Sequence, residues 1–339
     1  FLSGPEVQRE QPSLHGERRG SRPREYELHL SRAVNGSLSS TPMKIPYLAE
    51  SKTSKRSNPM TTLKKIASLT VLLIAAAMLS RCTPAPSRMI TETIYSEALG
   101  EERTCCVYLP ENFDPDQTYP VVFATDGQVL LDGGYDTLLD ELIEKGTIPP
   151  VVLIGAYSNE NTVSDGMELR YYEYIDSDDA TSRSDADAAG GASADPRIAG
   201  RFHHHLSYFT SELRDSIFTE YAIRPDTQKI LFYGCSNGGD YGLTLYTTQP
   251  GELFTDYICL SPVGTDSDAI SCAGTALLYV AYGSKESEMP VIGDNLRALH
   301  EKLDAINDGT ITVHVFDGGH DRACWKQAFA TALTALLNR

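Results

Sequence analysis

The sequence has 339 residues, 41% of them hydrophobic and 22% charged, a globular composition that excludes a disordered chain. Its formal net charge of −17 is uneven, because residues 1–81 contain 13 Lys/Arg and 6 Asp/Glu whereas residues 82–339 contain 16 and 40. A body this acidic repels phosphate backbones and anionic lipid head groups, so no nucleic-acid partner is expected.

The chain starts with a segment that we interpret as a leader followed by a signal peptide. Residues 1–59 are polar, rich in Arg, Ser and Pro, and lack a helical or strand period, which predicts a disordered or mistranslated leader. Residues 60–81 begin with Met60 and contain two lysines followed by a short apolar run, the order of a secretory signal. That run is shorter than the roughly 18 residues that a membrane-spanning helix needs.

Cys82 directly follows this signal, an arrangement that resembles bacterial lipoprotein signals, in which the cysteine is lipidated and becomes the mature N-terminus. Arg81 departs from that pattern, because such signals have a small residue before the cysteine. We expect an exported protein, periplasmic or attached to the outer membrane only through a lipid on Cys82. An ordinary cleaved signal and an uncleaved N-terminal anchor are the alternatives.

The mature region, residues 82–339, alternates predicted strands and helices. Strands are predicted over 88–96, 103–109, 120–125, 150–156, 229–234, 256–261, 276–282 and 311–316, and helices over 135–145, 205–221, 237–247, 290–306 and 322–337. Several strands are continuous apolar runs, as in parallel sheets covered on both faces, and the first two form an antiparallel edge. The fold class is therefore α/β, a mostly parallel eight-stranded sheet with helices on both faces, with residues 176–198 as a long loop over one edge.

Cysteines are scattered through this region: Cys105, Cys106, Cys235, Cys259, Cys272 and Cys324. They are too few for a disulfide scaffold in a domain of this size, and their pairing does not follow from the sequence. There is no CxxC and no Cys/His spacing of a metal site, so neither a metal nor a cofactor is expected.

The clearest chemical motif is the G-x-S-x-G turn formed by residues 234–238, between a predicted strand and a predicted helix. The turn is so tight that a Cβ at Gly234 or Gly238 would collide with neighbouring backbone, and it raises the serine hydroxyl above the C-terminal edge of the sheet. Ser236 is therefore the predicted nucleophile, with the Asn237 amide directed at the oxyanion that forms. The alternative is a glycine-rich turn that only ends a strand.

A serine nucleophile needs a base. In folds with this strand–turn–helix serine motif, the acid and then the histidine follow the serine along the chain. His320 follows the last predicted strand, so its loop returns it to the edge that carries Ser236. His300 and His314 fall inside a predicted helix and a predicted strand, and residues 203–205, three histidines, are interpreted as a solvated surface and not as a metal site. His320 is the predicted base.

The acid is expected in the loop after the strand that precedes the strand of His320. That loop contains Glu286 and Glu288, of which Glu286 is the first candidate and Glu288 the second. Solvated loop carboxylates are the competing interpretation for both. Asp321 is a poorer acid, because side chains adjacent in sequence rarely align with the imidazole.

The chain resembles the esterase family that contains enterochelin-esterase-like hydrolases, feruloyl and acetylxylan esterases, and mycolyltransferases. The resemblance extends over about residues 88–337, and its most specific parts are the Gly234–Gly239 turn and the GGHD segment before the last helix. Its motifs are Val107-Tyr108-Leu109-Pro110, Tyr119-Pro120-Val121-Val122, Asp126-Gly127-Gln128, Arg170 with Glu173-Tyr174, Gly234–Gly239, Gly283–Glu286, and Gly319-His320-Asp321 with Trp325.

This resemblance implies an α/β-hydrolase fold for residues 82–339, with Ser236 as nucleophile, Glu286 as acid and His320 as base. It implies a second oxyanion donor in the loop after the third strand, the backbone amide of Gln128. Asp126 would orient that loop or contact substrate. Arg170 would bind a carboxylate or sugar of the substrate, or tie down the long loop.

The resulting hypothesis is an exported serine esterase acting on a small-molecule or glycan ester, either a carbohydrate-linked acyl or feruloyl ester or a siderophore-type ester. The acidic body disfavours a highly anionic substrate unless the pocket is locally basic. An acyltransferase of the same fold is a variant. A surface lipoprotein that uses the fold only for binding is the alternative from another class.

Overall fold

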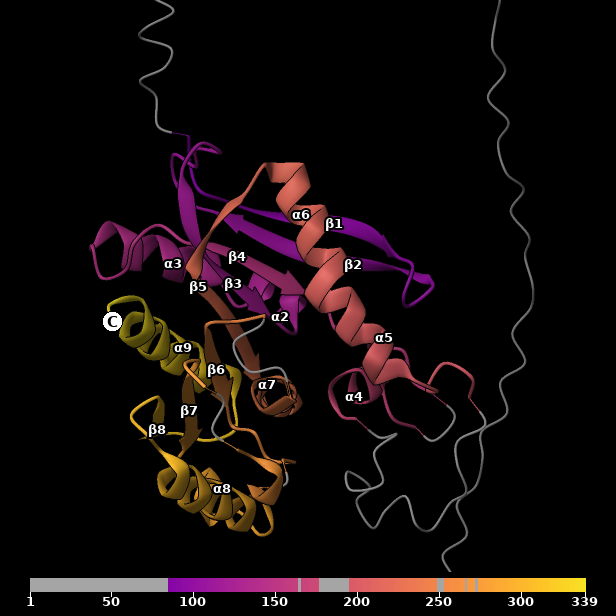
Figure 1. Ribbon diagram of the computed structural model, residues 1–339, viewed down its shortest axis with the longest axis vertical. Helices are drawn as coiled ribbons and strands as arrows, with labels where there is room; N and C mark the ends of the chain where they lie inside the picture. Colours follow the sequence, from indigo (N-terminus) through magenta and orange to yellow (C-terminus); the bar gives the residue numbers. More distant parts are fainter. Residues whose placement is uncertain (1–84, 164–165, 177–194, 249–252, 266, 272–273) are drawn as a thin grey trace, which may run out of the picture. The chain divides into compact units, whose positions relative to one another are not determined.

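The computed structural model describes residues 85–163, 166–176, 195–248, 253–265, 267–271 and 274–339 (Figure 1). The predicted leader, the signal peptide and Cys82 lie outside the described residues, and so does most of the predicted loop 176–198. Within the described residues, no helix is both long and apolar enough to cross a membrane.

One sheet organises the described residues, with its strands in the order β1-β2-β4-β3-β5-β6-β7-β8. β2 runs antiparallel to both neighbours, and all other neighbouring pairs are parallel. The prediction of a mostly parallel eight-stranded sheet is confirmed. The strands are β1 (Arg88–Ser96), β2 (Glu101–Leu109), β3 (Thr118–Ala124), β4 (Val152–Ala156), β5 (Arg224–Cys235), β6 (Asp256–Leu260), β7 (Leu277–Gly283) and β8 (Ile311–Phe316).

The helices include all five regions predicted from the sequence and two further short ones. They are α2 (Gly127–Asp132), α3 (Tyr135–Glu144), α4 (Leu169–Tyr174), α5 (Arg201–Ser207), α6 (Leu213–Tyr221), α7 (Asn237–Thr248), α8 (Ile292–Ile306) and α9 (Arg322–Leu337), with a π-helical turn over Tyr208–Glu212. The unpredicted α2 and α4 have six residues each, too few to show a helical period. The connection from β4 to β5 carries α4, α5 and α6.

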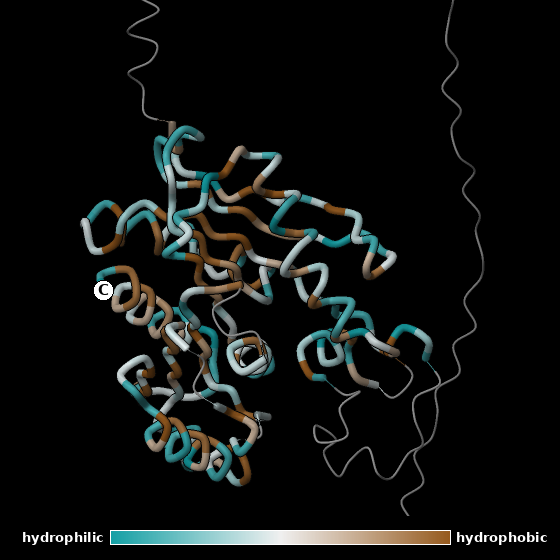
Figure 2. Tube along the Cα trace, in the orientation of Figure 1, coloured by the Kyte–Doolittle hydropathy of each residue, from teal (hydrophilic) through white to brown (hydrophobic). Residues whose placement is uncertain are grey.

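The core consists of two apolar layers, one on each face of the sheet. Side chains of a strand alternate between the layers, so Cys105 and Val107 of β2 belong to one and Cys106 and Tyr108 to the other. Helices α5, α6, α7 and α8 cover the first face, and α3 and α9, which lie together in Figure 1, cover the second. Figure 2 shows the hydrophobic residues concentrated along the central strands.

The described cysteines are all free thiols, so the described residues contain no disulfide: Cys105, Cys106, Cys235, Cys259 and Cys324. Cys259 is fully buried in β6. Cys272 lies outside the described residues.

Candidate active site

Polar residues follow the ends of β3, β5, β6, β7 and β8, which are parallel or linked through parallel neighbours and therefore end at one edge of the sheet. The residues are Gln128 after β3, Ser236 after β5, Ser261 after β6, Glu286 after β7 and His320 after β8. Ligand sites in open α/β sheets form at this edge. The topology therefore brings together residues that are up to 192 positions apart, from Gln128 to His320.

Ser236 lies at the apex of the turn between β5 and α7 with a φ of 55°, in the left-handed region. A non-glycine residue held there costs about 1–3 kcal/mol and is found mostly at functional sites. The flanking glycines are required by space: a Cβ on Gly234 would lie 2.2 Å from the Gly238 carbonyl oxygen, and one on Gly238 would lie 2.3 Å from Thr125 Oγ1. The Ser236 amide donates to the Leu260 carbonyl at 2.9 Å, which ties the turn to β6.

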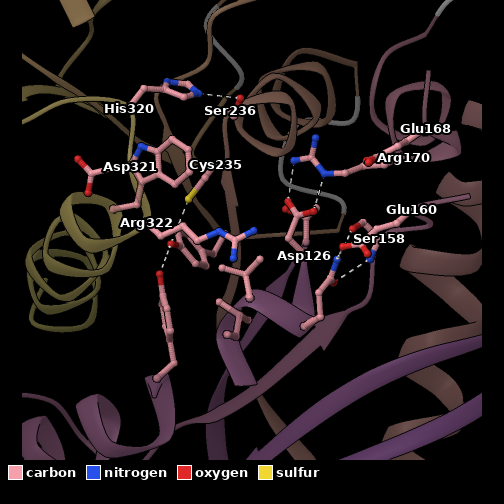
Figure 3. A pocket seen from close by; sticks show the side chains of 17 residues that line it. Asp126, Ser158, Glu160, Glu168, Arg170, Cys235, Ser236, His320, Asp321 and Arg322 are labelled. Atoms are coloured by element: carbon pink, nitrogen blue, oxygen red, sulfur yellow. Dashed lines mark hydrogen bonds and ion pairs between the residues drawn. The ribbon is translucent and has the colours of Figure 1, made fainter. Parts of the chain in front are cut away.

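A chain of hydrogen bonds joins Ser236, His320 and Glu286 (Figure 3 shows the first bond). His320 Nε2 is 3.0 Å from Ser236 Oγ, and His320 Nδ1 is 3.1 Å from Glu286 Oε1. An ionised carboxylate can only accept a hydrogen bond, so His320 Nδ1 carries the proton and donates to Glu286, and Nε2 is the acceptor for the serine hydroxyl. This arrangement can remove the serine proton as the hydroxyl attacks a carbonyl carbon.

Glu286, and not Glu288, is the carboxylate that contacts the histidine. The Glu286 side chain is fully buried, whereas Glu288 is exposed on the same short 3₁₀ turn. Glu286 accepts hydrogen bonds from Ser261 Oγ at 2.8 Å and from the Gly283 amide at 3.1 Å. Asp321 instead caps α9, accepting from the amides of its first turn.

Ser261 was not predicted as a site residue, yet its hydroxyl links Glu286 to Trp325. Its hydroxyl donates to Glu286 and accepts from Trp325 Nε1 at 2.8 Å, and the Trp325 ring packs edge-on against His320 at 4.7 Å between centroids. Ser261 also has a φ of 48°. The available signal was a polar residue directly after a buried strand that ends at the same edge.

The two predicted oxyanion donors are placed at helix starts. Asn237 is the first residue of α7 and Gln128 the second of α2, positions whose amides have no partner within their own helix. The Gln128 side chain is engaged elsewhere: its amide nitrogen donates to Ser158 Oγ and to Glu160 at 2.9 Å, and its oxygen accepts from the Ser158 amide at 3.1 Å.

Asp126 and Arg170, both predicted to contact substrate or to hold a loop, are paired with each other. Arg170 donates to the two Asp126 carboxylate oxygens at 2.6 and 2.9 Å and to Asn237 Oδ1 at 3.1 Å. Its guanidinium also lies over the Tyr174 ring, 4.8 Å from the centroid. These contacts tie α4 to the loop after β3 and to the serine turn. The long loop that Arg170 was predicted to tie down lies mostly outside the described residues.

A cavity of about 460 Å³ opens beside Ser236 and His320. Its wall includes buried Leu130, the hydrogen-bonded hydroxyls of buried Tyr135 and Tyr233, which are 2.8 Å apart, and half-buried Cys235. The volume and the mixture of apolar walls with a few polar groups are those of small-molecule sites.

The model of the protein family described as "Putative esterase" matches residues 96–289, more than half of the chain. The chain belongs to this esterase family. Its activity is therefore that of a carboxylic ester hydrolase. No curated protein sequence matches the esterase.

Solved structures share the fold of the esterase at low sequence identity. A ferulic acid esterase has a TM-score of 0.55 and 17% identity, covering 75% of this chain and 99% of its own. The enterobactin esterase FES from Shigella flexneri has a TM-score of 0.55 and 17% identity, covering 75% of this chain and 60% of its own. The feruloyl esterase module from Clostridium thermocellum has a TM-score of 0.52 and 14% identity, covering 74% of this chain and 87% of its own.

A buried ion cluster fixes the position of α4 in the esterase. Glu173 of α4 is fully buried between Arg103 of β2 and Arg201 of α5, whose side chains are 4% and 5% exposed. Arg103 makes a bidentate contact with Glu173 and donates to the Tyr157 carbonyl at 2.8 Å. Arg201 donates to Glu173 at 2.6 Å. Because Arg170 lies on the same short helix, this cluster also positions the contacts of Arg170.

The interpretation of residues 203–205 as a solvated surface is wrong for one of the three histidines. His203 and His204 are exposed, but His205 is fully buried and packs against Phe209 and Tyr241. The helix begins at Arg201, four residues before the predicted start, so His205 lies within it and faces the sheet. Burial lowers the pKa of His205 to about 3.

Asp240, in the first turn of α7, is a buried acid that the reaction chemistry does not use. It accepts from the Gly264 amide at 3.0 Å and from Thr265 Oγ1 at 2.6 Å, while its Oδ2 has no partner among the described residues. Burial, opposed by the hydrogen bonds from Thr265 and Gly264, raises the pKa of Asp240 to about 6. An acid whose pKa is raised by folding stabilises the fold while it is protonated.

The free energy of unfolding of the wild type should decrease as the pH rises from about 4 to about 6, and we expect this decrease to be absent from the Asp240→Asn protein. A difference of about two pKa units corresponds to about 2–3 kcal/mol, so the variant should be the more stable protein at pH 7 by up to this amount. Urea unfolding of both proteins at pH 4, 5, 6 and 7 measures the difference. Asp215→Asn, which removes an exposed carboxylate of α6, is the matched control. Free energies of unfolding that change with pH by the same amount in Asp240→Asn and wild type would contradict the prediction.

Proposed function

We propose that the esterase cleaves its substrate through an acyl-enzyme on Ser236. The observation that supports this most directly is the hydrogen-bonded chain from Ser236 Oγ through His320 to buried Glu286, with distances of 3.0 and 3.1 Å, at the wall of a cavity. Nucleophile, base and acid thus stand in contact in the order that acyl transfer requires.

In the proposed reaction Ser236 Oγ attacks the ester carbonyl carbon while His320 Nε2 accepts the hydroxyl proton. Glu286 stabilises the imidazolium that results, and the amides of Asn237 and Gln128 donate to the oxyanion. Collapse of the tetrahedral intermediate expels the alcohol, which takes the proton from His320. Water then repeats the sequence on the acyl-enzyme and releases the acid. These steps use only groups of this chain and water.

For the substrate we propose a small-molecule or glycan ester, such as a carbohydrate-linked acyl or feruloyl ester or a siderophore-type ester. The cavity volume of about 460 Å³ admits one acyl group with part of its alcohol. A ferulic acid esterase and an enterobactin esterase share the fold, which makes both ester types the first to test. Acyl transfer to an alcohol is the variant in which a hydroxyl replaces water.

The proposal includes export, which rests on the signal pattern of residues 60–81, with a lipid on Cys82 as the only membrane anchor. Fractionation of cells that express the full chain tests it, because retention of the protein in the cytoplasm would contradict export. Incorporation of labelled palmitate that depends on Cys82 distinguishes a lipoprotein from an ordinary cleaved signal.

The activity is tested with a panel of chromogenic acetate, butyrate and feruloyl esters, together with labelling by a fluorophosphonate. We expect turnover of at least one ester and modification of Ser236, located by mass spectrometry of the labelled peptide. Ester turnover in the presence of added alcohols separates hydrolysis from transfer. Absence of both turnover and Ser236 labelling would favour the binding lipoprotein.

A further inference from the structure

Arg322 is a cation that faces the cavity and has no partner among the described residues. It is the first residue of α9, its side chain is exposed, and it lines the cavity beside Ser236 and His320. Figure 3 shows its guanidinium directed into the space that the lining side chains surround. It makes no ion pair or hydrogen bond with any residue that the structure describes.

The other cation of the cavity is neutralised. Arg170 is paired with Asp126 through both carboxylate oxygens. Glu160 accepts from the Gln128 side chain, and it lies with Glu168 on the opposite side of the cavity from Arg322 (Figure 3). The guanidinium of Arg322, which has no partner among the described residues, therefore stands on the same wall as Asp321, a carboxylate engaged by the amides of α9, and Glu160 and Glu168 stand on the other.

The position of Arg322 is locally unfavourable, which argues that helix stability does not explain it. The N-terminus of a helix carries a partial positive charge, so a cation there is destabilising by several tenths of a kcal/mol to about 1 kcal/mol. Asp321 caps the helix through its amides and makes no contact with the guanidinium. Residues that break a local rule without a local gain are found mostly at functional sites.

We propose that Arg322 binds a single carboxylate on the substrate, so that the preferred ester is a monoanion. The cavity is lined by Asp126, Glu160, Glu168, Asp321 and only two guanidinium groups, a balance that disfavours a polyanion. A guanidinium presents its N–H groups in a planar fork that matches a carboxylate. This inference rests on the proposed esterase function and specifies its substrate class. The Arg322 guanidinium also provides the local positive charge that an anionic ligand needs in order to bind to an acidic protein.

The kinetic test compares esters that differ only in one negative charge. 4-Nitrophenyl hydrogen succinate and its methyl ester place the charge on the acyl side, and 3-acetoxybenzoate and its methyl ester place it on the alcohol side. The measured quantity is the ratio of kcat/KM for the charged member to that for the neutral member. In at least one pair we expect Arg322→Gln to lower this ratio at least about tenfold and Arg322→Lys to retain part of it. Arg214→Gln on α6, the loss of one positive charge that is half-buried, paired with Asp215 and absent from the cavity lining, should change it less than about twofold.

A binding test does not require turnover. Trp325 is the only tryptophan of the chain and lines the cavity, so its fluorescence reports ligands there. N-(4-nitrophenyl)succinamic acid and its methyl ester are the uncleaved amide analogues of the first ester pair. The acid should bind at least about tenfold more tightly than its methyl ester, and Arg322→Gln should remove the difference.

The outcomes separate the two proposals. Turnover that depends on Ser236, with charge ratios that Arg322→Gln leaves unchanged in both ester pairs and in binding, overturns the carboxylate site and leaves the esterase. Binding of the acid that depends on Arg322, without turnover of any ester, overturns the proposed reaction and leaves the carboxylate site. Loss of the charge ratio in Arg214→Gln as well as in Arg322→Gln would assign the preference to long-range charge and overturn the site.

Discussion

A Ser236→Ala protein is expected to hydrolyse activated esters at least about 10⁴-fold more slowly than the wild type. The hydroxyl that His320 contacts at 3.0 Å would be gone, while the cavity and the oxyanion donors would remain. Residual turnover would then come from water attacking a bound ester. The measurement is kcat under saturating ester, with circular dichroism to show that the fold is retained.

The same reasoning predicts strong non-additivity. His320→Ala should lose about as much as Ser236→Ala, and the double variant should lose no more than either, because each change already disables the same proton transfer. Ser211→Ala, a change of an exposed serine in the π-helical turn, is the matched control and should retain full activity. More than about 1% of wild-type kcat in Ser236→Ala would assign the nucleophile to another residue.

The second large effect concerns stability. Glu173→Ala is expected to lower the free energy of unfolding by about 3–5 kcal/mol, because it removes the fully buried member of the two carboxylates that Arg103 and Arg201 share. The two guanidinium groups would then keep only the half-buried Glu101 as a common partner. Urea unfolding measures the change. Glu141→Ala on α3 removes an exposed carboxylate that pairs with Lys145, and it should cost less than about 1 kcal/mol. Equal losses in the two variants would contradict the cluster as a major source of stability.

This cluster also predicts a pH dependence of the opposite sign to that of Asp240. Burial opposes ionisation of Glu173, but His205 in its protonated form and the two guanidinium groups lower its pKa to about 2. A carboxyl group with a depressed pKa stabilises the fold above its ordinary value near 4.5, and this contribution is lost as the pH falls toward 2. The loss on acidification should be smaller in the Glu173→Ala protein, in which the lowered pKa values of His205 and Glu101 still contribute.

The strands and the Ser236–His320 arrangement could be predicted from the sequence because their signals are local. Each inner strand is a short apolar run with a turn at its end, and the serine turn combines a required spacing with a strand before it and a helix after it. The order of strands along the chain then places the loop of His320 at the correct edge. Glu286 could be preferred over Glu288 from its place in the loop, although only the structure shows that it is buried.

Features that depend on distant parts of the chain could not be predicted. The pairing of Arg170 with Asp126 joins residues 44 positions apart, and the sequence left open whether each contacts substrate or a loop. Ser261 carries no motif, and its role as a link follows only from contacts with Glu286 and Trp325. His205 was misplaced because a short helix without a strong cap signal begins four residues earlier than its apolar pattern indicated.

The connection from β4 to β5 carries Ser158, Glu160, Glu168 and Arg170, which form the cavity wall opposite Arg322, whereas Ser236, Glu286 and His320 follow other strands. This connection contributes no strand to the sheet, so its length and sequence can change without a change in strand pairing. In evolutionary terms, this wall of the cavity and the groups of the proposed reaction are encoded on separate stretches of the gene, whereas Arg322 lies only two residues from His320. A lineage could acquire a new ester preference by exchanging one connection, provided that the replacement keeps the pair between Arg170 and Asp126.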